Sequence, residues 1–225
     1  MRGEEARHLT RVLRVEPGQL FELSDNRQAY LAEITEARGE RVTFRVIETL
    51  ASAPPLVGIT LAAALIKFDR FEWMMEKATE LGVERVLPVE AARSEKGLME
   101  ASRKRQERWS RIARESAQQS RRVTVPEILP AVRFSQALEM CADWRGFLEE
   151  AGALPLLRAL PETRRSADRI AVLLGPEGGW TGAERQAAAD AGWRPVSLGP
   201  TVLRAETAAT AALAVLTCAW MEAGQ

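Results

Sequence analysis

One segment near the C-terminus carries residue types suited to holding a small ligand. An apolar stretch at 169–174 predicts a buried strand, and it runs into the loop Gly175, Pro176, Glu177, Gly178 and Gly179. Glycines let a backbone approach a ligand closely, and parallel sheets bind ligands beyond the carboxyl ends of their strands. The segment therefore predicts a ligand-binding loop, with a plain turn before a helix as the simpler alternative.

The residues around this loop limit which ligand fits it. Thr181 and Glu184 have the spacing of a capping box, which predicts a helix beginning at 181. The glycine spacing differs from the GxGxxG of dinucleotide-binding loops. The carboxylate of Glu177 would also repel a pyrophosphate. A neutral or cationic ligand suits the loop better.

A second loop follows the next expected strand, at 193–198. It starts with Leu198 and Gly199, continues through Leu203 and Arg204, and leads into an apolar helix at 206–220. Glu206 is favourable at that helix N-terminus, where the dipole stabilises an acid by roughly 0.3–1 kcal/mol. Two such loops on neighbouring strands would form one pocket.

Several kinds of chemistry are excluded by what the chain lacks. His8 is its one histidine, and the two cysteines, Cys141 and Cys218, form no CxxC pair. A histidine-based zinc site is therefore ruled out, and we expect no metal. There is no GxSxG nucleophile elbow and no phosphate-binding P-loop. What remains is chemistry carried by a bound organic cofactor, or none.

Basic residues are concentrated in one part of a chain that is neutral overall, with 31 acidic and 31 basic side chains. Residues 93–122 hold 10 basic and 4 acidic side chains, while the segments on either side are each net acidic. Much of this segment predicts a helix at 100–120 with one basic face. Such a face is most often simply solvated, but arginine stripes also supply the phosphate contacts of nucleic-acid binders.

The remaining pattern predicts two domains. Short alternating stretches at 20–23, 28–35 and 41–49 predict strands of a small β-barrel or open sheet. Residues 51–55 are typical of a linker. Strand and helix patterns alternate after it, with strands at 56–66 and 83–89 and a helix around 71–81, which predicts a mostly parallel sheet with helices on both faces.

Length and hydropathy set the expected location. The 225 residues are 46% hydrophobic and 28% charged, as in ordinary globular proteins. The N-terminal stretch MRGEEARHLTR lacks the apolar region of a signal peptide. The longest apolar stretch, 207–221, is about five residues short of a membrane span. We therefore expect a cytoplasmic protein that does not insert into a membrane.

Taken together, these motifs resemble a known family. LLGPEGGWTGAE and LGPTVLRAETAA, about twenty residues apart, are similar to the SPOUT-class RsmE methyltransferases of bacterial 16S ribosomal RNA. HLTRVLRVEPG, EKATELGVERVLPVEAARS and QQSRRVTVPEI extend the resemblance over nearly the whole chain. The family often has a basic residue at the position of Thr201 and a threonine at that of Ala205.

The resemblance implies an α/β fold of two domains. Residues 1–66 would form a PUA-like RNA-binding β-barrel, and residues 67–225 a SPOUT methyltransferase domain with a trefoil knot and a homodimer interface. The implied reaction is methylation of N3 of a specific uridine in 16S rRNA within the 30S subunit. The implied cofactor is S-adenosylmethionine, bound by Leu174, Gly175, Pro176, Glu177, Gly178, Gly179, Leu198, Gly199, Leu203, Arg204 and Thr207.

Roles for individual side chains follow from the same reading. Arg204 is predicted to stabilise the developing uracil oxyanion, and Glu206 to accept a proton or to position the reactants. RNA contacts are predicted from His8, Arg11, Arg14, Lys67, Arg93, Lys104, Arg108, Arg111, Arg121 and Arg122. Two alternatives stay open: a non-catalytic RNA-binding module, and an enzyme acting on a small nucleotide. The group that deprotonates N3, and whether free rRNA or the assembled 30S particle is the substrate, are also open.

Overall fold

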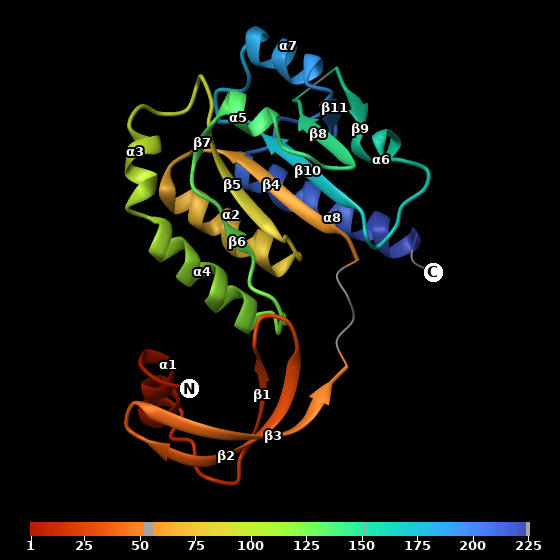
Figure 1. Ribbon diagram of the computed structural model, residues 1–225. Coiled ribbons are helices and arrows are strands. Elements are labelled where there is room, and N and C mark those ends of the chain that lie inside the picture. The colour runs from red at the N-terminus through yellow and green to blue at the C-terminus, as the bar shows by residue number, and fades with distance from the viewer. Residues whose placement is uncertain (52–55, 151, 224–225) are drawn as a thin grey trace. The chain divides into compact units, whose positions relative to one another are not determined.

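The computed structural model describes residues 1–51, 56–150 and 152–223 of the chain (Figure 1). It divides into two compact units, Met1–Ala53 and Pro54–Gln225. Apart from Ala51, the predicted linker at 51–55 lies outside the described residues.

The boundary predicted between residues 66 and 67 lies too late in the chain. Strand β4 (Gly58–Ala64) pairs in parallel with β5 (Arg85–Glu90) on one side and β10 (Arg169–Leu174) on the other. Nearly all of its residues are buried. A strand in the middle of a sheet cannot be separated from that sheet, so β4 belongs to the second unit.

The first unit is an antiparallel sheet of three strands, β1 (Leu20–Ser24), β2 (Ala29–Arg38) and β3 (Arg41–Leu50), in that order. Helix α1 (Glu4–Arg7) continues into a π-helical segment, η1 (His8–Val12). Ala6, Val15, Ile34 and Val42 form its small core. Of the two predicted architectures, a small barrel or an open sheet, the described residues form the open sheet, in which the edge strands β1 and β3 do not pair with each other.

The second unit contains one parallel sheet with the strand order β6-β5-β4-β10-β8-β11-β9, and β7 also pairs with β5. Here β4 (orange) and β10 (cyan) lie side by side at its centre (Figure 1). The remaining strands are β6 (Glu127–Ile128), β7 (Val132–Arg133), β8 (Trp144–Leu148), β9 (Leu154–Pro155) and β11 (Arg194–Ser197).

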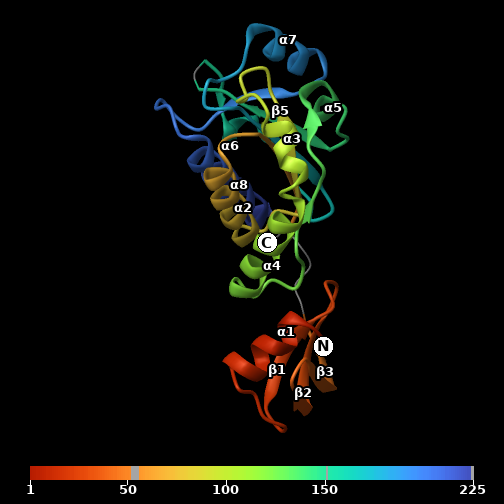
Figure 2. The same cartoon turned by 90° about the vertical axis from the view of Figure 1, so that its left-hand side faces the viewer.

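Helices cover both faces of this sheet, as the alternating pattern predicts (Figure 2). One core packs the sheet against α2 (Phe68–Glu80), α4 (Gln106–Gln119), α6 (Leu156–Ala159) and α8 (Ala205–Ala223). The other core includes α5 (Phe134–Leu138) and α7 (Gly182–Asp190). Because both faces are buried, the central strands are continuously apolar rather than alternating.

The predicted single helix at 100–120 is two helices. Helix α3 (Leu98–Arg103) ends where the amides of Lys104 and Arg105 donate to carbonyls three residues earlier, and α4 then begins at Gln106. These tighter hydrogen bonds close a turn that the helical periodicity did not reveal. The apolar face of α4 is as predicted, with Trp109 and Ala113 fully buried.

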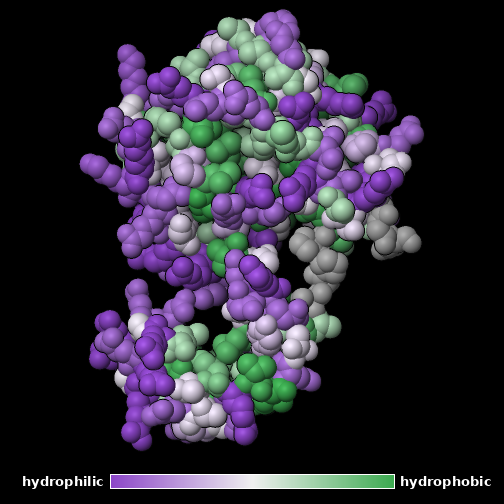
Figure 3. All heavy atoms as spheres, viewed as in Figure 1, coloured by the Kyte–Doolittle hydropathy of each residue, from purple (hydrophilic) through white to green (hydrophobic). Residues whose placement is uncertain are grey.

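The surface is mixed. Hydrophilic side chains cover much of the visible face of each unit, with hydrophobic residues showing between them (Figure 3). Within the described ranges, no helix combines the length and the apolar character needed to cross a membrane.

Candidate functional site

The loops that follow β10 and β11 meet at the carboxyl edge of the sheet, where they form one cleft of about 420 Å³. This volume is in the range of sites for small organic ligands, roughly 300–1,000 Å³. Strands β10 and β11 are not neighbours as predicted, because β8 lies between them. Among the predicted cofactor-binding residues, those that line the cleft are Leu174, Gly175, Pro176, Glu177, Gly179, Leu198, Gly199, Leu203 and Arg204. Gly178 and Thr207 do not line it.

Trp180 anchors the first loop from beneath. Its side chain is 2% exposed, stacks on Phe147 with ring centroids 4.7 Å apart, and donates from Nε1 to the Leu148 carbonyl at 3.0 Å. A Cβ at Gly175 would lie 3.0 Å from this indole, so only glycine fits without displacement. Gly179 has a φ of +66°, and its amide donates to the Pro176 carbonyl at 2.8 Å. The path of the loop is thus set by its packing.

Two arginines hold the carbonyls of the same loop. Arg93, from the segment after β5, donates from Nη1 to the Gly178 carbonyl at 2.7 Å and to that of Trp180 at 3.4 Å. Arg185 on α7 donates to the Trp180 carbonyl at 2.8 Å. It also pairs with Glu149 at 2.6 Å, and this carboxylate raises the pKa of the Arg185 guanidinium. Both arginines therefore hold the loop by hydrogen bonds from their guanidinium groups to its carbonyls.

The capping box predicted at the start of α7 is confirmed. The Thr181 side chain accepts from the Glu184 amide at 3.2 Å, and the Glu184 carboxylate accepts from the Thr181 amide at 2.8 Å. The other Glu184 oxygen accepts from the Ala92 amide at 2.7 Å. The buried carboxylate thus joins the helix start to the same segment that carries Arg93.

The second loop has fewer internal contacts. Ser197 Oγ exchanges hydrogen bonds with the amide and the carbonyl of Gly199 at 3.2 and 3.1 Å. Val202 is 72% exposed. Arg204 lines the cleft, and no ion pair to its guanidinium occurs in the described part of the chain. This arginine is therefore available to a ligand.

Glu206 occupies a different position from Arg204. It lies in the first turn of α8 and does not line the cleft. Its Oε2 atom is buried and has no hydrogen-bond partner among the described residues. The helix dipole stabilises a carboxylate at this position. Because Glu206 lies outside the cleft lining, the structure does not bring it against a reacting base.

The charges around the cleft are balanced, with three arginines and three glutamates in its lining. Arg70, near the start of α2, forms an ion pair with Glu177. Sequence reasoning missed Arg70, Glu149, Glu150, Trp180 and Arg185. Trp180 directly follows the glycines and could have been included, whereas the others come from elements that only the tertiary fold brings here.

Some of the predicted RNA-binding residues are engaged inside the protein. The buried Glu72 of α2 accepts from Arg108 Nε at 2.9 Å with both oxygens, which raises the pKa of this arginine, and it also pairs with Arg105. Arg122 donates to the Thr79 carbonyl at 2.7 Å near the end of α2, and burial lowers its pKa. Part of the charge of the basic segment is therefore balanced by an acid outside it, Glu72 of α2.

Other predicted RNA-binding residues remain exposed. Arg111 forms a long ion pair, with 3.9 Å between its Nε atom and Oε1 of Glu115, one turn further along α4. The backbone of Arg14 and Arg121 is left-handed, with φ of 51° and 55°, an unusual conformation for arginine. No ion pair in the described part of the chain involves the exposed side chains of His8, Arg11, Arg14, Lys67, Lys104 and Arg121.

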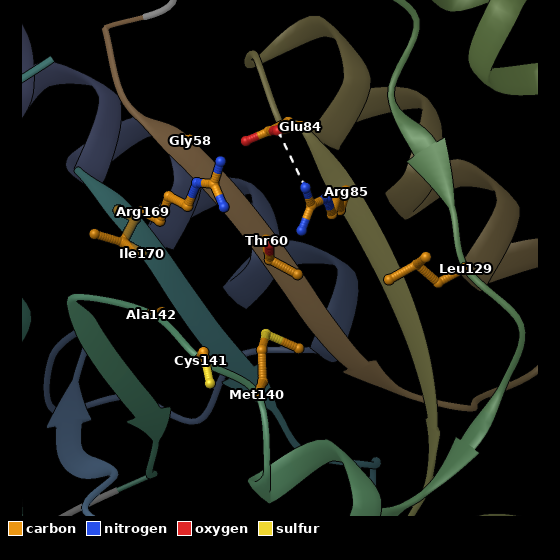
Figure 4. Close-up of a pocket in the computed structure, with 10 residues that line it drawn as sticks. All are labelled: Gly58, Thr60, Glu84, Arg85, Leu129, Met140, Cys141, Ala142, Arg169 and Ile170. Carbon is orange, nitrogen blue, oxygen red and sulfur yellow. Dashed lines mark ion pairs between the residues drawn. The ribbon is translucent and has the colours of Figure 1, made fainter. Parts of the chain in front are cut away.

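A smaller hollow of about 60 Å³ lies at the opposite, amino ends of the strands (Figure 4). Arg85 from β5 and Arg169 from β10 extend over Thr60, and Glu84 pairs with Arg85 at 3.6 Å. A hollow of this volume has room for roughly a few water molecules. It is too small for an organic ligand, so the carboxyl-end cleft is the candidate site.

Comparison with known proteins identifies the class first. A family model described as an RNA methyltransferase domain matches residues 53–217, and one described as an RNA methyltransferase PUA domain matches residues 2–47. The two matches agree with the two units of the fold. The class is therefore an RNA methyltransferase with an N-terminal PUA domain.

Individual relatives make this more specific. The ribosomal RNA small subunit methyltransferase E of Bacillus subtilis is 32% identical over 223 residues, covering 95% of this chain and 87% of the relative. That of Synechocystis is 35% identical over 218 residues, covering 92% and 68%. A crystal structure of the enzyme from Neisseria gonorrhoeae bound to S-adenosylmethionine superimposes with a TM-score of 0.87 at 31% identity, covering 98% and 91%. The chain belongs to the ribosomal RNA small subunit methyltransferase E family.

Proposed function

We propose that this protein transfers a methyl group from S-adenosylmethionine to N3 of a uridine in the RNA of the small ribosomal subunit. The observation that carries this is the single cleft formed by both glycine loops, with the unpaired Arg204 at its wall. Family membership supports the methyl transfer and the ribosomal RNA. The choice of uridine N3 rests on the sequence resemblance.

The cleft suits adenosylmethionine better than a phosphorylated cofactor. Two of the three arginines in its lining are paired, Arg70 with Glu177 and Arg185 with Glu149, which leaves Arg204 alone to face a pyrophosphate. Gly175 and Gly179 both belong to the cleft lining, so the loop offers backbone rather than long side chains to a ligand there. The residues that would hold the cofactor are the nine predicted ones that line the cleft.

Bound adenosylmethionine supplies an electrophilic methyl carbon for in-line attack. The chain itself has to orient the uracil, because holding two reactants in line can lower a barrier by about 7–11 kcal/mol. To Arg204, which lines the cleft, we assign the stabilisation of the negative charge that develops on a uracil oxygen when a base removes the N3 proton. For Glu206 we propose a positioning role at the start of α8, since it does not line the cleft.

RNA contacts on each unit are assigned to the exposed basic residues rather than to those paired within the protein. His8, Arg11 and Arg14 on the first unit, and Lys67, Lys104 and Arg121 on the second, are available for phosphate contacts. The proposal also includes a homodimer, a trefoil knot in the second unit, and action in the cytoplasm on rRNA within the 30S particle. These features rest on the family resemblance.

Calorimetric titration of the protein with adenosylmethionine tests the cofactor, with ATP and NAD as controls. Selective binding of adenosylmethionine is expected. Isotope-labelled adenosylmethionine is then incubated with free 16S rRNA or with 30S particles that lack base methylation, and the nucleosides are identified by mass spectrometry. Labelled 3-methyluridine supports the proposal. A different labelled nucleoside overturns the uridine assignment, and failure to bind the cofactor favours a non-catalytic RNA-binding module.

A further inference from the structure

Arg93 was expected to contact RNA, yet its observed contacts lie within the protein. Its Nη1 atom reaches the carbonyl of Gly178 at 2.7 Å and that of Trp180 at 3.4 Å. A Cβ placed on Gly178 would lie 3.4 Å from both Cβ and Cδ of Arg93. The glycine backbone thus packs directly on the aliphatic part of the arginine, and the guanidinium holds the carbonyls on either side of Gly179.

These contacts lie behind the cleft rather than inside it. Neither Gly178 nor Arg93 belongs to the cleft lining, whereas Gly175, Glu177 and Gly179 do. The turn that faces the ligand is therefore held from its outer side. Trp180 anchors the end of the turn through Leu148, and Arg93 holds the Gly178 carbonyl within the turn.

The segment carrying Arg93 is itself fastened to the same region. The Ala92 amide donates to Glu184 in the capping box of α7, and the Ala91 amide donates to Ser94 Oγ at 3.2 Å. These two hydrogen bonds fix the backbone just before Arg93 relative to the start of α7. A charged donor on a carbonyl forms a stronger hydrogen bond than a neutral one.

We propose that Arg93 is a positioning residue that holds the cofactor loop in its ligand-binding shape. This inference rests on the proposed function, because it assumes that the loop binds adenosylmethionine. Under this proposal, loss of Arg93 weakens the binding of the cofactor more than it weakens the binding of RNA. An RNA-contacting arginine would show the opposite dependence.

The test compares the full-length Arg93→Ala and Arg93→Lys variants with the unchanged protein. Arg93→Ala is expected to raise the Kd and the KM for adenosylmethionine about tenfold, with the KM for RNA and the turnover at saturating cofactor changed less than threefold. Arg93→Lys is expected to recover part of the cofactor affinity. Lys96→Ala is the matched control, since Lys96 is an exposed cation three residues along and its loss should leave cofactor binding unchanged.

Each outcome separates the two proposals. If the unchanged protein binds no adenosylmethionine, the proposed function fails whatever the variants do. If it binds but Arg93→Ala keeps the same affinity, or raises only the KM for RNA, the positioning role is wrong and the proposed function stands. Thermal unfolding of each variant checks that a loss of affinity does not come from global unfolding.

Discussion

The two glycine loops look alike in sequence but are built differently. The loop at 175–180 is held by a buried tryptophan, two arginines and a capping box. The loop at 199–204 has Ser197 at its start and the first turn of α8 at its end, where the Ala208 amide donates to the Arg204 carbonyl at 2.8 Å. Between these points its side chains are largely exposed.

This difference separates the two tasks of a transfer site. A loop whose shape is already held within the protein loses little freedom when a cofactor binds, which favours affinity. A loop with an exposed valine and an unpaired arginine can still adjust to the second reactant. We therefore expect changes in the first loop to alter stability and cofactor binding, and changes in the second to alter turnover.

The largest effect on stability is expected from Trp180→Ala. Removing a buried indole that stacks on Phe147 leaves a cavity, and such changes lower the free energy of unfolding by about 3–5 kcal/mol. Denaturant unfolding measures the loss. Trp73→Ala is the control, because Trp73 on α2 is 45% exposed and should cost less than about 1 kcal/mol. If both variants lose the same free energy of unfolding, Trp180 holds the first loop no more firmly than an exposed side chain would.

Arg204→Ala is expected to leave stability almost unchanged but to lower turnover about 100-fold, equivalent to about 2.7 kcal/mol, through loss of charge stabilisation in the transition state. Rates are measured at saturating RNA and cofactor, and Lys96→Ala, at an exposed lysine outside the cleft lining, is the control. Near-normal turnover of Arg204→Ala would remove this arginine from the mechanism.

Thr181→Ala tests the capping box at the start of α7. Loss of the side-chain cap should lower the free energy of unfolding by about 1 kcal/mol. Thr201→Ala in the second loop is the matched control, because Thr201 is exposed and should change stability by less than about 0.5 kcal/mol. A larger loss in the control would show that the second loop is held more firmly than its contacts indicate.

Val202→Ser should have the smallest effect on the folded chain, less than about 0.5 kcal/mol, because the side chain is already 72% exposed. Thermal unfolding with and without adenosylmethionine measures it. A marked loss of stability in the absence of ligand would mean that this valine is covered in solution, and the second loop would then resemble the first.

Much of the site was predictable because it depends on local order along the chain. The apolar strand before Gly175, the capping box at Thr181 and the helix after Arg204 are each encoded within a few residues, and all were found at the predicted places. The basic segment was harder to interpret. Its charge excess is visible in the sequence, but Glu72, which pairs with Arg105 and Arg108, lies more than thirty residues away.

The sequence by itself determined the alternation of strands and helices, the two glycine loops and the family to which they belong, because these follow from short-range patterns. Only the tertiary structure decided that Glu72 pairs with two arginines of the basic segment, that Arg93 faces loop carbonyls, and that Arg70 meets Glu177. The physical reason is that hydrogen bonds and ion pairs act over a few ångströms. Which distant residues come within that range depends on how the sheet orders its strands.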